Sequence, residues 1–314
     1  MQCSETNIHL PGVFCSEEIQ FMRNRYRLPR LGARFIAGLV VLVAALSSPA
    51  HAADGGCEPA KAASKYPGLG GKTIKIGQDG ESVPFSQRDP KDFSKLIGLD
   101  ADLARAAFAC VGVPFDFTIG TWSGLIPAAM AGQIDVMWDT LLYTPERAKK
   151  LNFVVYMNAA TGMLVAKGNP KNIHAVGDLC GLTATTTLGT TQEAMLRDAD
   201  NKCIAAGKPA VNIITSPDMP SGLRLVQSGR ADLVAVNKFV GDSMVASSPG
   251  TVESAFDVIT GAKISVGTAK GNSDLVNAIR DGLLAIRANG TEKAIYEKYH
   301  VDYNLSTDPT VLTE

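Results

Sequence analysis

The sequence predicts an α/β fold made of two lobes. Short apolar runs alternate with helical patterns along most of the chain, and this alternation is typical of parallel strands covered by helices. Residues 131–136 (AGQIDV) and 228–233 (SGRADL) form a faint internal echo, because each joins a helical pattern to an apolar run. The length of 314 residues also exceeds the size at which one hydrophobic core usually stops growing. One large doubly wound sheet is the alternative architecture.

The predicted strands are short and apolar, and we expect them to be buried on both faces. They lie at residues 73–77, 115–118, 136–138, 183–187, 211–215 and 233–236. The predicted helices lie at 100–111, 123–131, 191–201, 219–228 and 238–246, with a last pair at 274–289 and 292–299. Ligands of open α/β folds gather at the carboxyl ends of the strands, so we expect the functional residues there.

Residues 1–52 predict a secretory signal peptide. Five arginines between residues 23 and 34 precede the apolar stretch 35–46, and Ala50-His51-Ala52 forms a small-residue cleavage site before Ala53. Twelve apolar residues are too few to cross a bilayer core of about 30 Å as a helix, so we expect no permanent anchor. Acids and cysteines before Met22 fit a basic leader poorly, which indicates Met22 as the true start.

Charge and cysteine content narrow the class of protein. The formal net charge is −1, which gives no reason to expect nucleic acid or an anionic membrane as a partner. Four of the six cysteines follow residue 52, and an even number in an exported chain favours disulfides over metal binding or catalysis. We pair Cys180 with Cys203 and Cys57 with Cys110, one of three possible connectivities. Residues 54–56 lack the apolar residue of a lipoprotein signal, so a free periplasmic protein is expected.

Residues 144–147 (TPER) predict the start of a helix with a cation in its first turn. Thr144 suits the N-cap, and Pro145 suits the first helical position, where no N–H donor is needed. Arg147 then lies beside free N–H groups at the positive helix end, at a cost of about a few tenths of a kcal/mol. An anion bound opposite Arg147 explains this arrangement better. The alternative is a surface arginine paired with Glu146 or another acid.

Six segments resemble, in order and spacing, the polar amino-acid-binding proteins of ABC importers, which are the family 3 solute-binding proteins. They are GLDADLA (98–104), WSGLIP (122–127), GQID (132–135), TPER (144–147), DLCG (178–181) and GTTQ (189–192). The resemblance covers about residues 73–299. It implies a periplasmic-binding-protein-like fold, in which crossing segments near 158–161 and 261–265 join two α/β lobes and the ligand cleft lies between them. Lobe 1 would comprise residues 53–159 and 264–314, and lobe 2 residues 160–263.

The resemblance also implies the function. A member of this family captures an amino acid or a related small carboxylate in the periplasm and delivers it to the permease of an ABC transporter in the inner membrane. We expect a monomer that is not an enzyme, with no cofactor, no metal and no nucleic-acid partner.

The family pattern assigns a carboxylate site around Arg147, whose planar guanidinium can grip two oxygens at once. Backbone N–H groups near Leu142 and Thr191 would complete that site, and Thr140 would add a hydroxyl group. Trp122 would place its ring against the ligand, unless it is a core aromatic under a helix start.

The family pattern also gives roles to Thr190 and Asp79. Thr190 belongs to the loop 189–191, which the second lobe would contribute to the closed site. Asp79 lies where relatives place an acid that contacts basic ligand side chains, although a turn-capping aspartate is the alternative.

Several residues depart from the family pattern. Asn237 stands where amino-acid binders usually carry an acid for the ligand ammonium group, and an amide cannot balance that charge. Asp139 replaces a small polar residue and could supply the missing charge from the first lobe. Ser82 replaces the aromatic residue that often covers the ligand, and Leu142 replaces a hydroxyl residue. These departures leave the identity of the ligand open.

Two other functions share this fold. The first is a periplasmic enzyme that dehydrates cyclohexadienyl compounds, for which Asp139, Glu81 or Asp79 could serve in proton transfer. Against it, the chain after residue 52 holds only two histidines, His174 and His300, far apart in the sequence. The second is a sensory binding protein that presents its closed form to a membrane receptor, and the sequence does not separate sensing from transport.

Overall fold

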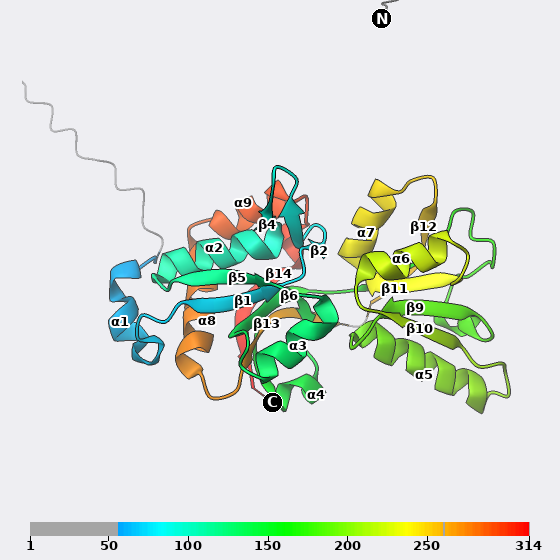
Figure 1. Ribbon diagram of the computed structural model, residues 1–314, viewed down its shortest axis with the longest axis horizontal. Helices are drawn as coiled ribbons and strands as arrows, with labels where there is room; N and C mark the ends of the chain where they lie inside the picture. Colours follow the sequence, from blue (N-terminus) through cyan, green and yellow to red (C-terminus); the bar gives the residue numbers. More distant parts are fainter. Residues whose placement is uncertain (1–55, 260, 314) are drawn as a thin grey trace, which may run out of the picture. The chain divides into compact units, whose positions relative to one another are not determined.

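The computed structural model describes residues 56–259 and 261–313 (Figure 1). The predicted signal peptide, its cleavage site before Ala53 and the start at Met22 lie outside these residues. In the part of the chain that is described, no helix has the length and apolar character needed to cross a membrane.

The strands and helices alternate along the chain as the sequence predicts. The strands are β1 (Ile74–Gln78), β2 (Glu81–Ser82), β3 (Ser86–Asp89), β4 (Asp92–Ile97), β5 (Phe115–Ile119), β6 (Val136–Leu142), β7 (Leu151–Asn158), β8 (Thr161–Ala166), β9 (Thr183–Thr187), β10 (Asn212–Ser216), β11 (Leu233–Asn237), β12 (Val252–Val258), β13 (Lys263–Ala269) and β14 (Ser306–Leu312). The α-helices are α1 (Ala62–Lys65), α2 (Leu99–Val111), α3 (Trp122–Met130), α4 (Pro145–Ala148), α5 (Thr191–Ala205), α6 (Met219–Gln227), α7 (Lys238–Ser247), α8 (Ser273–Ala288) and α9 (Thr291–Lys298). Short 3-10 helices lie at Pro59–Lys61, Pro67–Leu69, Val176–Leu179 and Tyr303–Leu305.

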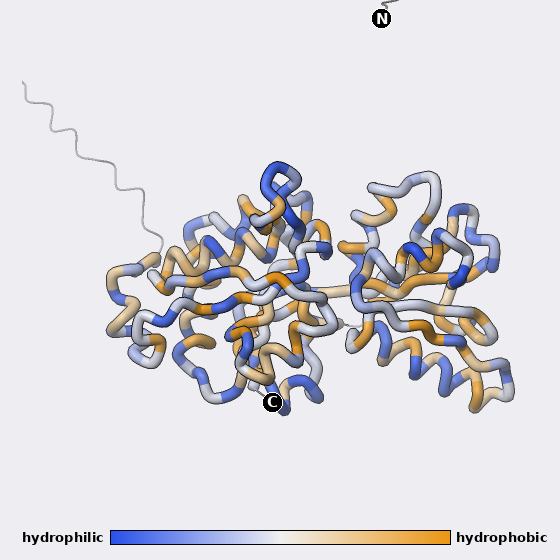
Figure 2. The backbone as a smooth tube through the Cα atoms, viewed as in Figure 1, coloured by the Kyte–Doolittle hydropathy of each residue, from blue (hydrophilic) through white to orange (hydrophobic). Residues whose placement is uncertain are grey.

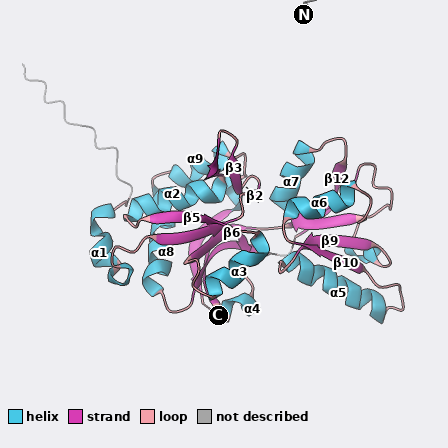
Figure 3. Cartoon of the chain, in the orientation of Figure 1, coloured by secondary structure: helices cyan, strands magenta, loops and turns pink. Residues whose placement is uncertain are grey.

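Two large sheets define two lobes. The first lobe contains a six-stranded sheet in the order β14-β7-β13-β6-β1-β5, and the second a five-stranded sheet in the order β10-β9-β11-β8-β12. A small sheet of β2, β3 and β4 follows β1. The chain passes to the second lobe between β7 and β8 and returns between β12 and β13. Figure 3 shows helices on both sides of each large sheet. The two-lobe prediction is confirmed, and the single-sheet alternative is wrong for the described chain.

The internal echo marks equivalent places in the two lobes. Strands β5-β1-β6 and β10-β9-β11 have the same parallel order, with the first strand in the middle. Asp135 of the first echo segment accepts a hydrogen bond from the N–H of Lys75 at 2.9 Å, and its own N–H donates to the Lys75 carbonyl. Asp232 of the second segment makes the same pair of bonds with Thr183, at 2.8 Å from the carboxylate. Each aspartate therefore fixes a helix-to-strand connection to the neighbouring strand.

The predicted parallel pairing is incomplete. Strand β13 runs antiparallel to β6 and β7, and β8 runs antiparallel to β11 and β12. These strands escaped the sequence analysis because β7–β8 and β12–β13 follow one another without a helix between them. The prediction that all the strands are buried on both faces is also wrong for some of them. Strand β6 is buried throughout, whereas the edge strands β5 and β10 keep partly exposed residues.

Apolar faces of the helices pack on the sheets. In Figure 2 the turns of α5 alternate between blue and orange, as expected for a helix with one buried face. Helix α2 packs closely on α8, and Gly282 makes this approach possible. A Cβ atom at residue 282 would lie 2.6 Å from the carbonyl oxygen of Ala107.

Gly282→Ala is expected to lower the free energy of unfolding by about 1–3 kcal/mol, the usual cost of overpacking. Alanine improves helix propensity by about 1 kcal/mol, but backbone atoms of α2 cannot move away as a flexible side chain would. Urea denaturation measures the change. Gly177→Ala is the matched control, since a Cβ atom there meets nothing within 4 Å. Equal stability of the two variants would contradict the proposed close contact.

Both predicted disulfides are present in the structure. Cys57 is bonded to Cys110 in the last turn of α2, so the segment before β1 is attached to the first lobe. Cys180 is bonded to Cys203 in α5, which attaches the segment before β9 to the helix that follows it. The expected connectivity is therefore confirmed.

Candidate functional site

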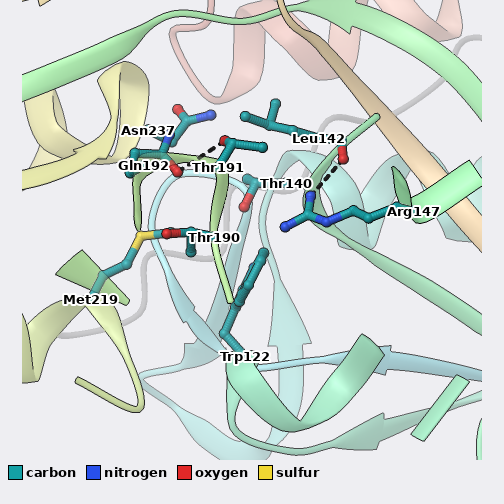
Figure 4. Close-up of a pocket in the computed structure, with 9 residues that line it drawn as sticks. All are labelled: Trp122, Thr140, Leu142, Arg147, Thr190, Thr191, Gln192, Met219 and Asn237. Atoms are coloured by element: carbon teal, nitrogen blue, oxygen red, sulfur yellow. Dashed lines mark hydrogen bonds between the residues drawn. The ribbon is translucent and has the colours of Figure 1, made fainter. Parts of the chain in front are cut away.

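A small cavity is lined by residues of both lobes (Figure 4). Its volume is about 10 Å³, which is space for about one water molecule. The first lobe contributes residues from the start of α3, the end of β6 and α4, and the second lobe contributes residues from the starts of α5 and α6 and the end of β11. The lining residues are Trp122, Thr140, Leu142, Arg147, Thr190, Thr191, Gln192, Met219 and Asn237.

Helix α4 positions Arg147 as the sequence predicts. The Thr144 hydroxyl oxygen accepts a hydrogen bond from the Arg147 N–H at 3.1 Å, and Pro145 occupies the first helical position. The guanidinium donates to two carbonyl oxygens. One bond, of 2.6 Å, is to Leu142 in the first lobe, and the other, of 2.7 Å, is to Gly189 in the second lobe. Arg147 therefore joins the two lobes across the cavity.

The positive charge of Arg147 is partly removed from water, and no acid among the described residues pairs with it. Burial lowers the pKa of Arg147 to about 10. Among the ion pairs of residues 56–259 and 261–313, none includes Arg147. The alternative of a surface arginine paired with Glu146 does not hold, because Glu146 pairs with Lys149 at 2.6 Å. A desolvated cation of this kind attracts an anion to the cavity.

Trp122 and Thr140 complete the first-lobe side of the cavity. Trp122 is 3% exposed, its ring centre lies 5.8 Å from the guanidinium carbon of Arg147, and its indole N–H donates to the Asp139 carbonyl at 3.0 Å. Trp122 also packs in the core with other residues of α3, as the core alternative predicts, and its contact with a ligand stays a prediction. Thr140 has a positive φ of 48°, and its N–H donates to a carboxylate oxygen of Asp100 at 2.8 Å. The Thr140 hydroxyl has no hydrogen-bond partner within the described chain.

The second lobe presents the start of α5 to the cavity. The Thr190 hydroxyl caps this helix by accepting from the N–H of Glu193 at 3.2 Å, and it donates to the carbonyl of Thr187 at 2.7 Å. Glu193 in turn accepts from the N–H of Gly189 at 2.7 Å, which orders the loop. Thr191 is the first helical residue, and N–H groups at this position have no acceptor inside the helix. The positive helix end therefore faces the same cavity as Arg147.

Asn237 ends β11 and caps α7. Its side-chain oxygen accepts a hydrogen bond from the N–H of Phe239 at 3.0 Å, which fixes the orientation of the amide. The amide nitrogen of Asn237 is buried and lacks a partner among the residues that the structure describes. Asn237 therefore offers a donor to the cavity.

Asp139 lies behind the cavity. It is fully buried, and its carboxylate accepts from the N–H of Asp79 at 2.7 Å. Burial, together with the negative charges of Asp79 and Asp100, raises the pKa of Asp139 well above the ordinary value. Alternation along β6 explains this position, since Thr140 and Leu142 line the cavity and the residue between Trp138 and Thr140 faces the other way.

Asp79 and Ser82 also lie outside the lining of this cavity. The Ser82 hydroxyl donates to Asp79 at 2.7 Å, and the N–H of Glu81 donates to the other carboxylate oxygen at 2.8 Å, so Asp79 caps a turn. Burial raises the pKa of Asp79. Asp79 faces a second cavity of about 240 Å³, together with Glu81, Arg88 and Asp218.

Two residues that line the cavity, Gln192 and Met219, were not among the site residues that the sequence predicted. Gln192 is buried, and its amide donates to the Thr161 hydroxyl at 3.1 Å. Met219 is the first residue of α6, directly after the capping residue Asp218. Both follow N-caps at the carboxyl ends of parallel strands, and this shared position was the signal that could have identified them. The carbonyl of Leu142 binds Arg147, and the expected N–H donor near Leu142 stays a prediction.

Comparison with known proteins identifies one family. The model of the bacterial extracellular solute-binding proteins, family 3, matches residues 74–302, which is most of the chain. The L-cystine-binding protein TcyJ of Escherichia coli strain K12 is 27% identical over 276 residues, covering 87% of this chain and 97% of the relative.

Two solved structures share the fold. An ancestral arginine-binding protein bound to arginine is 30% identical with a TM-score of 0.66, covering 72% of this chain and 97% of that protein. The ancestral amino acid-binding protein AncCDT-1, a precursor of cyclohexadienyl dehydratase, is 29% identical with a TM-score of 0.65 and covers 75% of this chain and 99% of that protein.

Proposed function

The chain belongs to the bacterial extracellular solute-binding proteins, family 3, and from this premise we propose that it captures an amino acid or a related small carboxylate and delivers it to the permease of an ABC transporter. One observation carries the proposal. Arg147 lies partly buried in a cavity lined by both lobes, with carbonyl groups but no acid as partners in the described chain. A ligand carboxylate is the group that best satisfies such a guanidinium.

The ligand would bind in two steps. The first lobe would bind the carboxylate through Arg147, with Thr140 and Trp122 beside it. The second lobe would then close with the start of α5 and Asn237. Each hydrogen bond to a charged group contributes about 1.5–3 kcal/mol, so a handful is enough for micromolar or tighter binding. The closed form is favoured by the additional contacts that the second lobe makes with the ligand.

The cavity of about 10 Å³ is smaller than any amino acid, so the lobes must separate before a ligand enters. The two links between the lobes lie after β7 and after β12. We propose residues 53–159 with 264–314 as one moving unit and residues 160–263 as the other.

The relatives support the class of ligand. The names of TcyJ and of the ancestral arginine-binding protein describe amino-acid binding, and these proteins match nearly over their whole length. We further propose that the chain acts as a monomer in the periplasm after removal of residues 1–52. N-terminal sequencing of the secreted protein tests that cleavage.

An enzyme on the same fold is the second candidate. The similarity to a precursor of cyclohexadienyl dehydratase and the raised pKa values of Asp79 and Asp139 favour it. General acid–base catalysis needs a carboxyl within hydrogen-bond reach of the substrate. Both aspartates lie outside the lining of the Arg147 cavity and bind backbone N–H groups instead. We therefore propose binding without turnover.

A thermal-shift screen of the secreted, processed protein against amino acids, amines, opines and small carboxylates tests the proposal. A ligand at a hundred times its dissociation constant stabilises the folded state by about 2.7 kcal/mol, which raises the melting temperature measurably. No stabilisation by any carboxylate would contradict the proposed function, and new products in the same mixtures would favour the enzyme. A sensory role is separated from transport by uptake measurements in cells that lack the permease.

A further inference from the structure

Two side chains that line the cavity of Arg147, Thr140 and Asn237, have buried polar atoms without a partner in the described chain. We propose that its ligand is a small carboxylate with an oxygen in place of the α-ammonium group, that is, a 2-oxo or 2-hydroxy acid. This inference rests on the proposed function, because it takes the carboxylate at Arg147 as given and concerns the neighbouring group.

The amide of Asn237 gives the first argument. Its oxygen is used by the N–H of Phe239, so the amide nitrogen is the atom left to meet a ligand. That nitrogen has no partner in the described part of the chain, and the residue is 3% exposed. A buried donor without an acceptor costs free energy, which a ligand oxygen recovers. An ammonium group offers only donors and would leave the cost in place.

The charge of the lining gives the second argument. Arg147 is the charged residue among the nine that line the cavity, and the start of α5 adds the positive end of a helix dipole. A ligand with an ammonium group would bring a further positive charge into a partly desolvated site. A monoanion without that group balances the charge of Arg147.

The buried acids behind the cavity are bonded to groups of the protein. Asp139 and Asp79 are bonded to each other through the Asp79 N–H, and Asp100 holds the Thr140 N–H and the Tyr156 hydroxyl. Burial is the largest cause of the raised pKa of each of the three, which favours their neutral forms. None of the three lines the cavity that contains Arg147.

Thr140 is compatible with an oxygen at this position, and its hydroxyl could equally accept from an ammonium group. Its hydroxyl lines the cavity, is buried, and lacks a partner among residues 56–259 and 261–313. Asp100 accepts a hydrogen bond from the backbone N–H of this residue, whose φ lies in the left-handed region. A hydroxyl group can donate to a 2-oxo group and can either donate to or accept from a 2-hydroxy group. Thr140 of the first lobe and Asn237 of the second lobe thus line the same cavity, and each has a polar atom that lacks a partner in the described chain.

Matched ligand series test the inference by calorimetry on the secreted, processed protein. The first series is L-alanine, L-lactate and pyruvate, the second is L-leucine with its 2-hydroxy and 2-oxo analogues, and the third is L-glutamate, 2-hydroxyglutarate and 2-oxoglutarate. We expect the oxygen analogue to bind at least tenfold more tightly than the amino acid in each series that binds. Tighter binding of the amino acid would overturn the inference and leave the proposed function standing.

The thermal-shift screen described above distinguishes failure of this inference from failure of the proposed function. If every carboxylate that stabilises the protein carries a free α-ammonium group, the inference is wrong although the proposed function holds. If no carboxylate stabilises the protein, the proposed function fails first and the inference fails with it.

Asn237→Asp is the variant that reverses the preference. Its new carboxylate can still cap the N–H of Phe239, so we expect the ratio of oxygen-analogue to amino-acid affinity to fall by at least tenfold. Asn201→Asp adds the same charge at an exposed position in α5 and should leave the ratio within twofold. An unchanged ratio in Asn237→Asp would overturn the role of Asn237, and the wild-type series remains decisive if that variant does not fold.

Discussion

Arg147→Ala is expected to weaken binding of the tightest carboxylate from the ligand screen by about 3–5 kcal/mol, because it leaves a buried ligand charge without its partner. This loss corresponds to a dissociation constant raised by roughly two to more than three orders of magnitude. Calorimetric titration of wild type and variant measures the difference. Arg147→Lys keeps the charge but loses the planar fork, so an intermediate loss is expected.

The matched control for this prediction is Lys149→Ala. Lys149 follows Arg147 by two residues, and its exposed side chain pairs with Glu146 outside the cavity. Its removal should change binding by less than about 0.5 kcal/mol, as for an ordinary surface substitution. A loss below about 1 kcal/mol in Arg147→Ala, in a protein that still unfolds cooperatively, would rule out the carboxylate role.

Asp100→Asn is expected to remove part of the pH dependence of stability. Burial raises the pKa of Asp100 in the folded protein to about 7, whereas an aspartate in an unfolded chain titrates near pH ~3.9. Between these values the folded state binds more protons, so the free energy of unfolding falls as pH rises, by about 1.4 kcal/mol per pH unit. Asparagine stays neutral. The variant should therefore gain up to about 4 kcal/mol relative to wild type between pH 4 and pH 7.5.

Denaturant titrations at a series of pH values measure this gain. Asp102→Asn, on the same helix, is the control with the opposite sign. Burial alone would raise the pKa of Asp102, but hydrogen bonds from Lys298 and Tyr299 lower it, so its contribution to stability is present above about pH 4. That variant should be less stable than wild type at neutral pH, and the gap should close in acid. A flat Asp100→Asn difference between pH 4 and pH 7.5 would show that Asp100 is ionised in the folded protein.

Local signals in the sequence predicted much of the fold. Thr144 and Pro145 mark the start of α4 because capping depends on one hydroxyl and one missing N–H, both visible in four residues. The echo segments were visible for a similar reason, since Asp135 and Asp232 repeat one local hydrogen-bond arrangement. Strands such as β7 and β8 were missed because their partners lie in sheets that only tertiary contacts define.

Seven of the residues that the sequence singled out lie around one cavity, and their role in binding stays a prediction. Arg147, Trp122, Thr140, Leu142, Thr190, Thr191 and Asn237 line one cavity. Asp139, Asp79 and Ser82 do not, because their hydrogen bonds hold them to one another and to the backbone. No sequence pattern specifies that Thr140 takes a positive φ, or that the N–H of Asp79 reaches the Asp139 carboxylate. Those features depend on how β1 and β6 lie side by side, which composition and spacing do not encode.

The bond from Arg147 to the carbonyl of Gly189 has a kinetic consequence. A guanidinium that already spans the cleft must release that oxygen before a solute can reach it, so only the released fraction of molecules is competent to associate. The apparent affinity is reduced by that fraction. In a stopped-flow experiment the observed association rate would then level off at high solute concentration, at the rate of spontaneous opening.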